Sequence, residues 1–283
     1  MMDRYTALSK VPAVTLGFWA IKILATTLGE TGGDALSMSW LGETTAAAGS
    51  SGLNGYLVGT AIFLPLLAVL VWLQIKAQSF RPWLYWATIV ASTMAGTTMA
   101  DYATRSLGIG YAGGSLLLLA LVLLSLLVWY RSLGTIAVDR IVTPKAEAFY
   151  WGTITLSQTL GTALGDWTVD DPRLGGFISH VLGTWSLDDG SLSYIGGAAV
   201  FGGLIAVLAA LYRFTSLSRV GLFWAAFILT RPLGATVGDF LDTPLAKGGL
   251  DISRPIATAV LLLAIAALIW LLPQRAGEHP KSV

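Results

Sequence analysis

The sequence contains no cysteine and only two histidines, His180 in a predicted loop and His279 in the tail. The absence of cysteine excludes disulfides, thiolate-bound metals and cysteine nucleophiles, and two separated histidines argue against a histidine-based metal or haem site. The chain has no Walker sequence and no nucleophile elbow beside His180. We therefore expect neither an enzyme nor a bound cofactor.

Charge is the second scarce property. Charged residues make up only 12% of the 283 residues, hydrophobic residues make up 55%, and the mean hydropathy is +0.71. This composition is too apolar for an ordinary soluble domain and predicts a single integral membrane domain over residues 1–283, with the lipid bilayer as its partner. A formal net charge of +1 offers no argument for nucleic-acid binding.

What the sequence does contain is a repeated skeleton of tryptophan, glycine and aspartate. In each copy the glycine follows the tryptophan by ten residues, and the aspartate follows the glycine by five. The four copies are Trp19/Gly29/Asp34, Trp86/Gly96/Asp101, Trp151/Gly161/Asp166 and Trp224/Gly234/Asp239. Such spacing does not recur four times by chance, so it predicts four internal repeats, approximately 10–76, 77–131, 140–213 and 214–275.

The apolar stretches predict an all-α, polytopic membrane protein with eight transmembrane helices, each of about 20 residues. The predicted spans are 12–34, 56–75, 82–101, 111–130, 145–166, 194–212, 219–239 and 255–272. Each repeat holds two spans, so all four copies enter the membrane in the same direction and form parallel repeats.

The distribution of basic residues predicts the orientation. Eleven lysines and arginines fall on the side of the N-terminus, whereas the opposite loops hold four: Arg105, Arg173, Lys247 and Arg254. By the positive-inside rule both termini are expected in the cytoplasm, with the chain in the inner membrane of a bacterium.

The odd-numbered spans each carry a polar stripe that ends in the repeated aspartate. Counting back in fours from Asp34 gives Glu30, Thr26 and Lys22, and residues four apart share one helix face. In hydrocarbon such a stripe has to face protein or a water-filled cavity. We therefore expect a central carboxylate cluster that binds cations or protons; its members are Glu30, Asp34, Asp101, Asp166 and Asp239.

The supporting polar residues are Lys22, Thr26, Thr97, Gln158, Thr162 and Arg231. Glu30 occurs in the first copy alone and lies one turn deeper than Asp34, which favours a proton carrier or direct ligand. Lys22 and Arg231 are interpreted as internal counter-ions rather than binders of a substrate anion. The neutral side chains either offer oxygen ligands or bond across helices, and the aspartates alternatively cap loops at the outer interface.

Oxygen-only ligands suit hard cations such as Mg²⁺, Ca²⁺, Mn²⁺ or protons, so the same five carboxylates are the candidate metal ligands. Small residues four apart, as in Gly29 and Gly33, accompany the aspartate in every copy. They indicate either close helix packing or local unwinding that frees backbone carbonyls beside the carboxylates.

Two resemblances bear on these patterns. The run from Lys10 to Asp34 and its echo from Pro144 to Asp166 resemble a bacterial family of uncharacterised membrane-anchored proteins over essentially the whole chain; that family implies no activity. Glu30-Thr-Gly-Gly-Asp34 is similar to the Glu-x-Gly-Asp signature of cation/proton exchangers for calcium or manganese. Here the motif is one residue longer, no basic residue follows it, and the later copies lack the glutamate.

These observations predict a secondary transporter of a hard cation, with proton-coupled export of a divalent metal such as manganese as the leading function. The expected partners are the inorganic cation and protons. A passive cation channel and a non-transporting membrane scaffold or sensor are the alternatives. No sequence feature indicates the oligomeric state.

Overall fold

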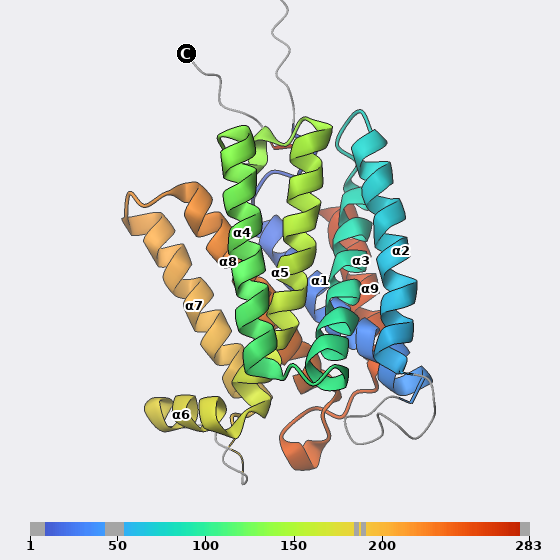
Figure 1. The fold of residues 1–283 in the computed structure, drawn as a ribbon, viewed down its shortest axis with the longest axis vertical. Coiled ribbons are helices and arrows are strands. Elements are labelled where there is room, and N and C mark those ends of the chain that lie inside the picture. The colour runs from blue at the N-terminus through green and yellow to red at the C-terminus, as the bar shows by residue number, and fades with distance from the viewer. Residues whose placement is uncertain (1–8, 43–53, 184–186, 188–190, 278–283) are drawn as a thin grey trace, which may run out of the picture.

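The computed structural model describes residues 9–42, 54–183, 187 and 191–277, and within these residues the chain is all-helical (Figure 1). The eight long helices are α1 (Leu16–Asp34), α2 (Gly55–Lys76), α3 (Pro82–Asp101), α4 (Tyr111–Leu133), α5 (Pro144–Asp170), α7 (Tyr194–Phe214), α8 (Arg219–Asp242) and α9 (Arg254–Leu271). The short elements are η1 (Ala35–Trp40), η2 (Tyr102–Ser106), η3 (Val138–Arg140), α6 (Pro172–Leu182) and η4 (Leu245–Lys247). His279 lies outside the described residues.

Five of the described helices, α2, α4, α7, α8 and α9, are long and apolar enough to cross a membrane. Four of them bury less than a quarter of their most apolar stretch within the protein, whereas α8 buries 56%. Helices whose apolar surface stays exposed need a hydrocarbon environment to cover it. The chain is therefore a membrane protein, as its composition predicts.

The helix boundaries follow the predicted spans with local differences. Thr15 caps the start of α1 by accepting a hydrogen bond from the amide of Phe18, so α1 begins after residue 12. At the other end of the fold, α5 and α8 continue one turn past the repeated aspartate, to Asp170 and Asp242. His180 lies in α6 rather than in a loop.

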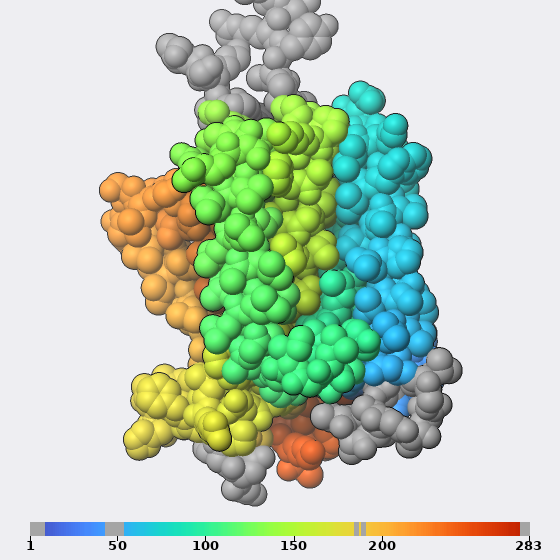
Figure 2. Space-filling view, in the orientation of Figure 1, coloured from blue at the N-terminus to red at the C-terminus, as the bar shows by residue number. Residues whose placement is uncertain are grey.

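The long helices form an inner ring and an outer layer. Helices α1, α3, α5 and α8 close the inner ring, because each packs along two of the others: α1 on α3, α3 on α5, α5 on α8 and α8 on α1. One outer helix covers each inner helix: α2 on α3, α4 on α5, α7 on α8 and α9 on α1. Helices α2, α4 and α7 thus each pack on the inner helix that comes next in the chain, and the last helix, α9, packs on α1. Figure 2 shows one side of this arrangement, with α2, α4 and α5 in contact and α6 projecting at one end.

The repeated glycines let the inner helices approach closely. A Cβ atom on any of them would overlap a side chain of the next inner helix, and in each case that side chain lies three residues before the next glycine. The pairs are Gly29 with Thr93, Gly96 with Gln158, Gly161 with Arg231 and Gly234 with Thr26. The helices run unbroken through these glycines. Their role in this fold is therefore close packing, while the backbone changes to π-helix only after Asp34 and Asp101.

A layer of aromatic rings closes one end of the inner ring. Each repeated tryptophan is preceded by a phenylalanine or tyrosine, and that residue contacts the tryptophan of the next repeat. The centroid distances are 5.6 Å for Phe18–Trp86, 5.6 Å for Tyr85–Trp151, 6.2 Å for Tyr150–Trp224 and 5.7 Å for Phe223–Trp19. The hydroxyls of Tyr85 and Tyr150 also share a buried hydrogen bond of 2.6 Å. These contacts fill the end of the ring with apolar side chains.

The two ends of the described chain meet beside this aromatic layer. The amide of Ser9 donates to the carbonyl of Gly277 at 3.0 Å, and Pro12 and Ala276 form an antiparallel bridge. Lys10 reaches across to Glu147 at the start of α5, at 2.6 Å. Ser9 and Gly277 therefore lie at the end of the bundle opposite the repeated aspartates, which stand at the C-terminal ends of the inner helices (Figure 1).

Candidate functional site

Three of the five predicted carboxylates meet inside the ring. Glu30 on α1, Asp166 on α5 and Asp239 on α8 each place one oxygen within 4.8 Å of the other two. Glu30 and Asp166 are each only 2% exposed, and Asp239 is half-buried. We refer to these residues as the carboxylate triad. It forms because the helices approach closely at the glycines, one to five residues before the carboxylates.

Arg231 on α8 extends across the ring beside the triad. Its Nη2 atom lies 2.7 Å from Oε2 of Glu30 and 2.5 Å from the hydroxyl oxygens of both Thr97 and Thr162. Glu30, Thr97 and Thr162 each follow the repeated glycine directly, on α1, α3 and α5. One guanidinium nitrogen therefore contacts all three of the other inner helices. Arg231 is fully buried, so this charge is balanced mainly by Glu30.

The threonines of the stripe make two kinds of contact. Thr97 lies between Arg231 and the first helix, because its hydroxyl is 3.0 Å from the carbonyl of Gly29 and 3.4 Å from Glu30. Thr26 instead bonds across helices, with its hydroxyl 3.0 Å from the carbonyl of Thr230. Thr97 and Thr162 thus belong to the site, whereas the Thr26 hydroxyl serves packing.

Lys22 and Gln158 lie deeper in the ring, on the side of the aromatic layer. Both are fully buried, and neither the Lys22 amine nor the Gln158 amide has a hydrogen-bond partner among the described residues. The Lys22 amine lies 4.3 Å from the centre of the Phe227 ring. Lys22 has no acid within ion-pairing distance in that part of the chain, so the counter-ion position is filled by Arg231.

Arg105 holds two of the repeated aspartates from the other side. Its Nη2 atom donates to Oδ2 of Asp166 at 3.0 Å and lies 3.8 Å from Asp170, while its Nε atom is 3.3 Å from Oδ1 of Asp101. The contact with Asp101 has ion-pair distance without hydrogen-bond geometry. Asp101 thus pairs with Arg105, and its oxygens are not among those that converge in the triad.

Arg254, at the start of α9, plays the corresponding part for Asp34. Its Nε atom lies 4.0 Å from Oδ2 of Asp34 and also pairs with Asp242. Asp34 thus pairs with Arg254 and is not among the carboxylates whose oxygens converge in the triad. Asp239 differs from the other three repeated aspartates, because the described residues place no basic group within 4.0 Å of it.

The sequence pattern assigned Arg105 and Arg254 to outer loops, and the structure places both in the charged network, together with Asp170 and Asp242. Two signals could have found them. Arg105 follows Asp101 by four residues and Asp170 follows Asp166 by four, which puts each on the face of its repeated aspartate if the helix continues. For Arg254 the sequence offers no such signal, since it reaches Asp34 from a helix at the far end of the chain.

The triad combines oxygen ligands with partly compensated charge. The triad carries three formal negative charges, and Arg231 and Arg105 supply two positive ones. Three carboxylates and two hydroxyls form an oxygen donor set of the kind that hard cations and protons prefer. One formal negative charge remains on the triad, so a positive particle is electrostatically favoured there.

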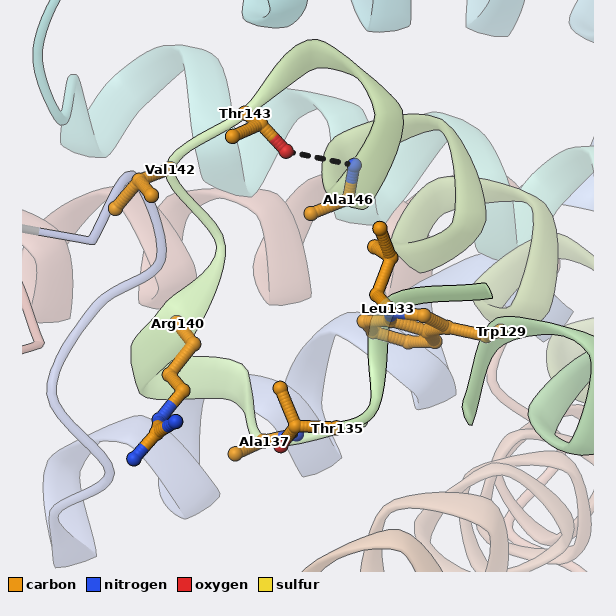
Figure 3. Close-up of a pocket in the computed structure, with 8 residues that line it drawn as sticks. All are labelled: Trp129, Leu133, Thr135, Ala137, Arg140, Val142, Thr143 and Ala146. Carbon is orange, nitrogen blue, oxygen red and sulfur yellow. Dashed lines mark hydrogen bonds between the residues drawn. The ribbon is translucent and has the colours of Figure 1, made fainter. Parts of the chain in front are cut away.

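A cavity in the described part of the chain lies elsewhere. It measures about 290 Å³ and is lined by Trp129 and Leu133 at the end of α4, by the connector to α5 and by Ala146 (Figure 3). In Figure 3 the Arg140 side chain points away from Trp129 across this connector. Twenty helical residues separate Ala146 from Asp166, so this cavity is about 30 Å from the triad.

These observations define the class: an all-helical membrane protein with an internal repeat and a buried charged network. The model of a family described as "Repeat of Unknown Function (DUF347)" matches four times, at residues 17–80, 84–135, 149–217 and 222–276. The chain therefore belongs to the DUF347 repeat family. No curated protein and no solved structure matches it.

Proposed function

We propose that the protein is a secondary transporter of a hard cation, most simply a proton-coupled exporter of a divalent metal such as manganese. The carboxylate triad is its cation and proton site. The observation that carries the proposal is that oxygens of Glu30, Asp166 and Asp239, from three different helices, lie within 4.8 Å of one another in the buried centre of a membrane protein.

The membrane arrangement in this proposal has eight spans and four parallel two-helix repeats. The eight long helices have 18 to 27 residues, enough for about 27–40 Å of rise. Lys76, Arg131 and Arg213 stand in the last turns of α2, α4 and α7, at the end of the bundle where the termini meet. This supports a bacterial inner-membrane protein with both termini in the cytoplasm.

A second observation supports a ligand rather than a purely structural role. Oδ1 of Asp34 and Oδ2 of Asp101 are buried without a hydrogen-bond partner in the described chain, in residues that are only 3% and 1% exposed. Unsatisfied carboxylate oxygens in a protein interior are costly unless a proton or cation visits them. The run from Glu30 to Asp34 is also similar to the exchanger signature, which supports a ligand-binding role as well.

The geometry favours a transporter over a standing pore. Along the axis that runs between the four inner helices, the aromatic layer fills one end. The Arg231 side chain crosses the centre, where it is hydrogen-bonded to the other three inner helices. On the opposite side Arg105 pairs with Asp166. A cation then reaches the buried oxygens of Glu30 and Asp166 only when one of these closures opens, which is the requirement of alternating access.

Proton coupling follows from the same balance of charge. A divalent cation on the triad adds two positive charges beside two arginines, so the site is overloaded if a carboxylate is also protonated. Protons and metal therefore compete for Glu30 and Asp239. Their exchange across the membrane is the transport reaction that we propose.

Flux measurements in proteoliposomes test the proposal. We expect Mn²⁺ movement that depends on an imposed pH gradient and that is lost in Asp239→Asn, because this substitution removes the triad carboxylate that no arginine of the described chain pairs. Asp242→Asn is the matched control, since this carboxylate lies three residues further along α8, pairs with Arg254 and is outside the triad. The control variant should retain flux.

Two other results would overturn the transporter. Flux that follows voltage alone and ignores the pH gradient would identify a passive channel. A failure to move Mn²⁺, Ca²⁺ or Mg²⁺, with no change in thermal stability on adding these ions, would leave a membrane scaffold or sensor. The double variant Asp34→Asn with Asp166→Asn adds a check, because lost flux in a folded protein supports transport and poor folding supports a structural role.

A further inference from the structure

We infer that Arg105 closes the carboxylate triad on the side opposite the chain termini, and that an incoming cation has to displace its guanidinium from Asp166. This inference rests on the function proposed above. It assigns to a residue outside the inner helices the role of setting both access to the site and the strength of cation binding.

The first argument is what the guanidinium binds. One nitrogen of Arg105 holds Oδ2 of Asp166 at 3.0 Å, and another lies 3.3 Å from Oδ1 of Asp101. The side chain therefore ties α5 to α3. Its hydrogen bond also occupies one carboxylate oxygen of Asp166, which is a triad residue.

The second argument is where Arg105 stands. It belongs to η2, the π-helical continuation of α3 beyond Asp101, and its side chain is 15% exposed, compared with 2% for Asp166. The guanidinium thus lies between Asp166 and the surface. Tyr56 and Tyr111 flank it: the Tyr56 hydroxyl is 3.5 Å from Nη1, and the Tyr111 ring centre is 5.8 Å from the guanidinium carbon.

The third argument is that Arg105 has a second place to bind. Asp170 lies one turn beyond Asp166 on α5, 3.8 Å from the same guanidinium nitrogen, and Tyr111 and Tyr194 hold its two oxygens at 3.3 and 3.2 Å. When a cation takes Asp166, mutual repulsion moves the guanidinium away. Asp101 and Asp170 can keep it paired nearby, so displacement does not leave a buried charge without a partner.

Arg254 provides the comparison that isolates this role. It is also an arginine on the same side of the ring and it also pairs with a repeated aspartate, but its partners Asp34 and Asp242 are outside the triad. Loss of Arg254 therefore removes similar charge and similar contacts without uncovering a triad oxygen.

The experiment uses the absence of native cysteine. Ala235 is fully buried on the same face of α8 as Arg231 and Asp239, one turn from each, so Ala235→Cys places a single thiol behind the closure. We measure its reaction with a water-soluble maleimide in nanodiscs. Adding Arg105→Gln should speed labelling about tenfold or more, the effect expected from losing charge-assisted hydrogen bonds. Adding Arg254→Gln should leave the rate unchanged.

Arg105→Lys is the second variant and retains the charge. A lysine cannot bridge Asp101 and Asp166 as a planar fork does, so its labelling rate should fall between those of the parent and of Arg105→Gln. If Arg105→Gln does not fold, the lysine variant decides: faster labelling than the parent supports the closure. Labelling of either variant at the rate of the parent or of Arg254→Gln would overturn the inference.

Mn²⁺ separates this inference from the proposed function. In Arg105→Gln the metal should bind more tightly and slow the labelling of Ala235→Cys at lower concentration than in the parent. Fast labelling that Mn²⁺ never slows, in any variant, would keep Arg105 as a closure and overturn manganese as the cargo. Slowing by Mn²⁺ at the same concentration in both proteins would show that Arg105 does not compete with the metal.

Discussion

The two ends of the inner ring differ in how closely the four repeats agree. At the end where the termini meet, every repeat supplies the same pair of residues, an aromatic ring followed by tryptophan, and every pair makes the same contact with the next repeat. At the opposite end every repeat supplies an aspartate, but the partners of the four aspartates differ. The contacts at one end are therefore alike in all four repeats, and the contacts at the other end differ from repeat to repeat.

The regular end is explained by packing alone. Tilted and edge-on aromatic pairs need only surface complementarity, and each adds about 0.5–1.5 kcal/mol beyond its buried area. Four equivalent helices meet that need with four equivalent contacts. Nothing at this end requires one repeat to differ from another, except the hydroxyl pair of Tyr85 and Tyr150.

The irregular end is explained by charge. A ring of four identical acids in a membrane interior would repel itself. The chain balances its acids with arginines that occur once: Arg105 and Arg254 pair with repeated aspartates, and Arg231 pairs with Glu30, which also occurs once. Because these residues differ between repeats, they leave Asp239 without a basic partner in the described chain and bring it into the triad. The repeated residues thus determine how the inner helices pack, and the unrepeated residues determine the charge of the site between them.

The largest break in this comparison should come from Arg231. Arg231→Met removes the partner of Glu30 and of two threonine hydroxyls, and it leaves a carboxylate buried without its counter-ion. We expect a loss of about 3–5 kcal/mol in the free energy of unfolding. Unfolding by SDS in mixed micelles measures it.

The matched control for Arg231→Met removes the partner charge as well, so that no unpaired charge is left. Glu30→Gln combined with Arg231→Met removes both charges, so stability should recover most of the loss while any cation flux stays absent. A double variant as unstable as Arg231→Met alone would mean that the contacts with Thr97 and Thr162, rather than the charge of Glu30, determine stability here.

The regular part of the molecule was predictable from its sequence. The spacing of tryptophan, glycine and aspartate predicted an internal repeat and inward-facing polar stripes, and the repeat is confirmed by the four family matches. The all-helical fold is confirmed for the described residues. Eight membrane spans and their orientation stay predictions, as does transport. The aromatic residue before each tryptophan is visible in the sequence, but its partner is in another repeat and became apparent only in the structure.

The irregular part was only half predictable. Five carboxylates were expected in one cluster, and the structure brings Glu30, Asp166 and Asp239 together while Asp34 and Asp101 pair with arginines. Periodicity could not reveal this division, because it is set by the distances between carboxylates on different helices, which a single-helix pattern does not contain.

Gly161→Ala tests the boundary between the two ends. A Cβ at this position would overlap the Arg231 side chain and push it from the centre of the ring, so we expect a loss of about 1–3 kcal/mol in unfolding free energy. Gly152→Ala is the control on the same helix, since no atom lies within 4 Å of an added Cβ; a helix favours alanine there by up to about 1 kcal/mol. Equal effects of the two substitutions would contradict a special role for the close approach at Gly161.

The smallest predicted effect concerns the one asymmetry of the aromatic end. Tyr85→Phe removes a hydroxyl that is 2.6 Å from the hydroxyl of Tyr150 and leaves the ring contact with Trp151 in place. The loss should be about 1 kcal/mol, since hydrogen bonds between membrane helices are worth little more. Adding Tyr150→Phe should restore part of it, because no buried hydroxyl is then left unpaired. A double-mutant cycle on unfolding free energies measures this coupling. If these variants alter cation flux as strongly as Asp239→Asn does, the aromatic end takes part in transport. The distinction between a packing role for the aromatic end and a binding role for the aspartate end would then be wrong.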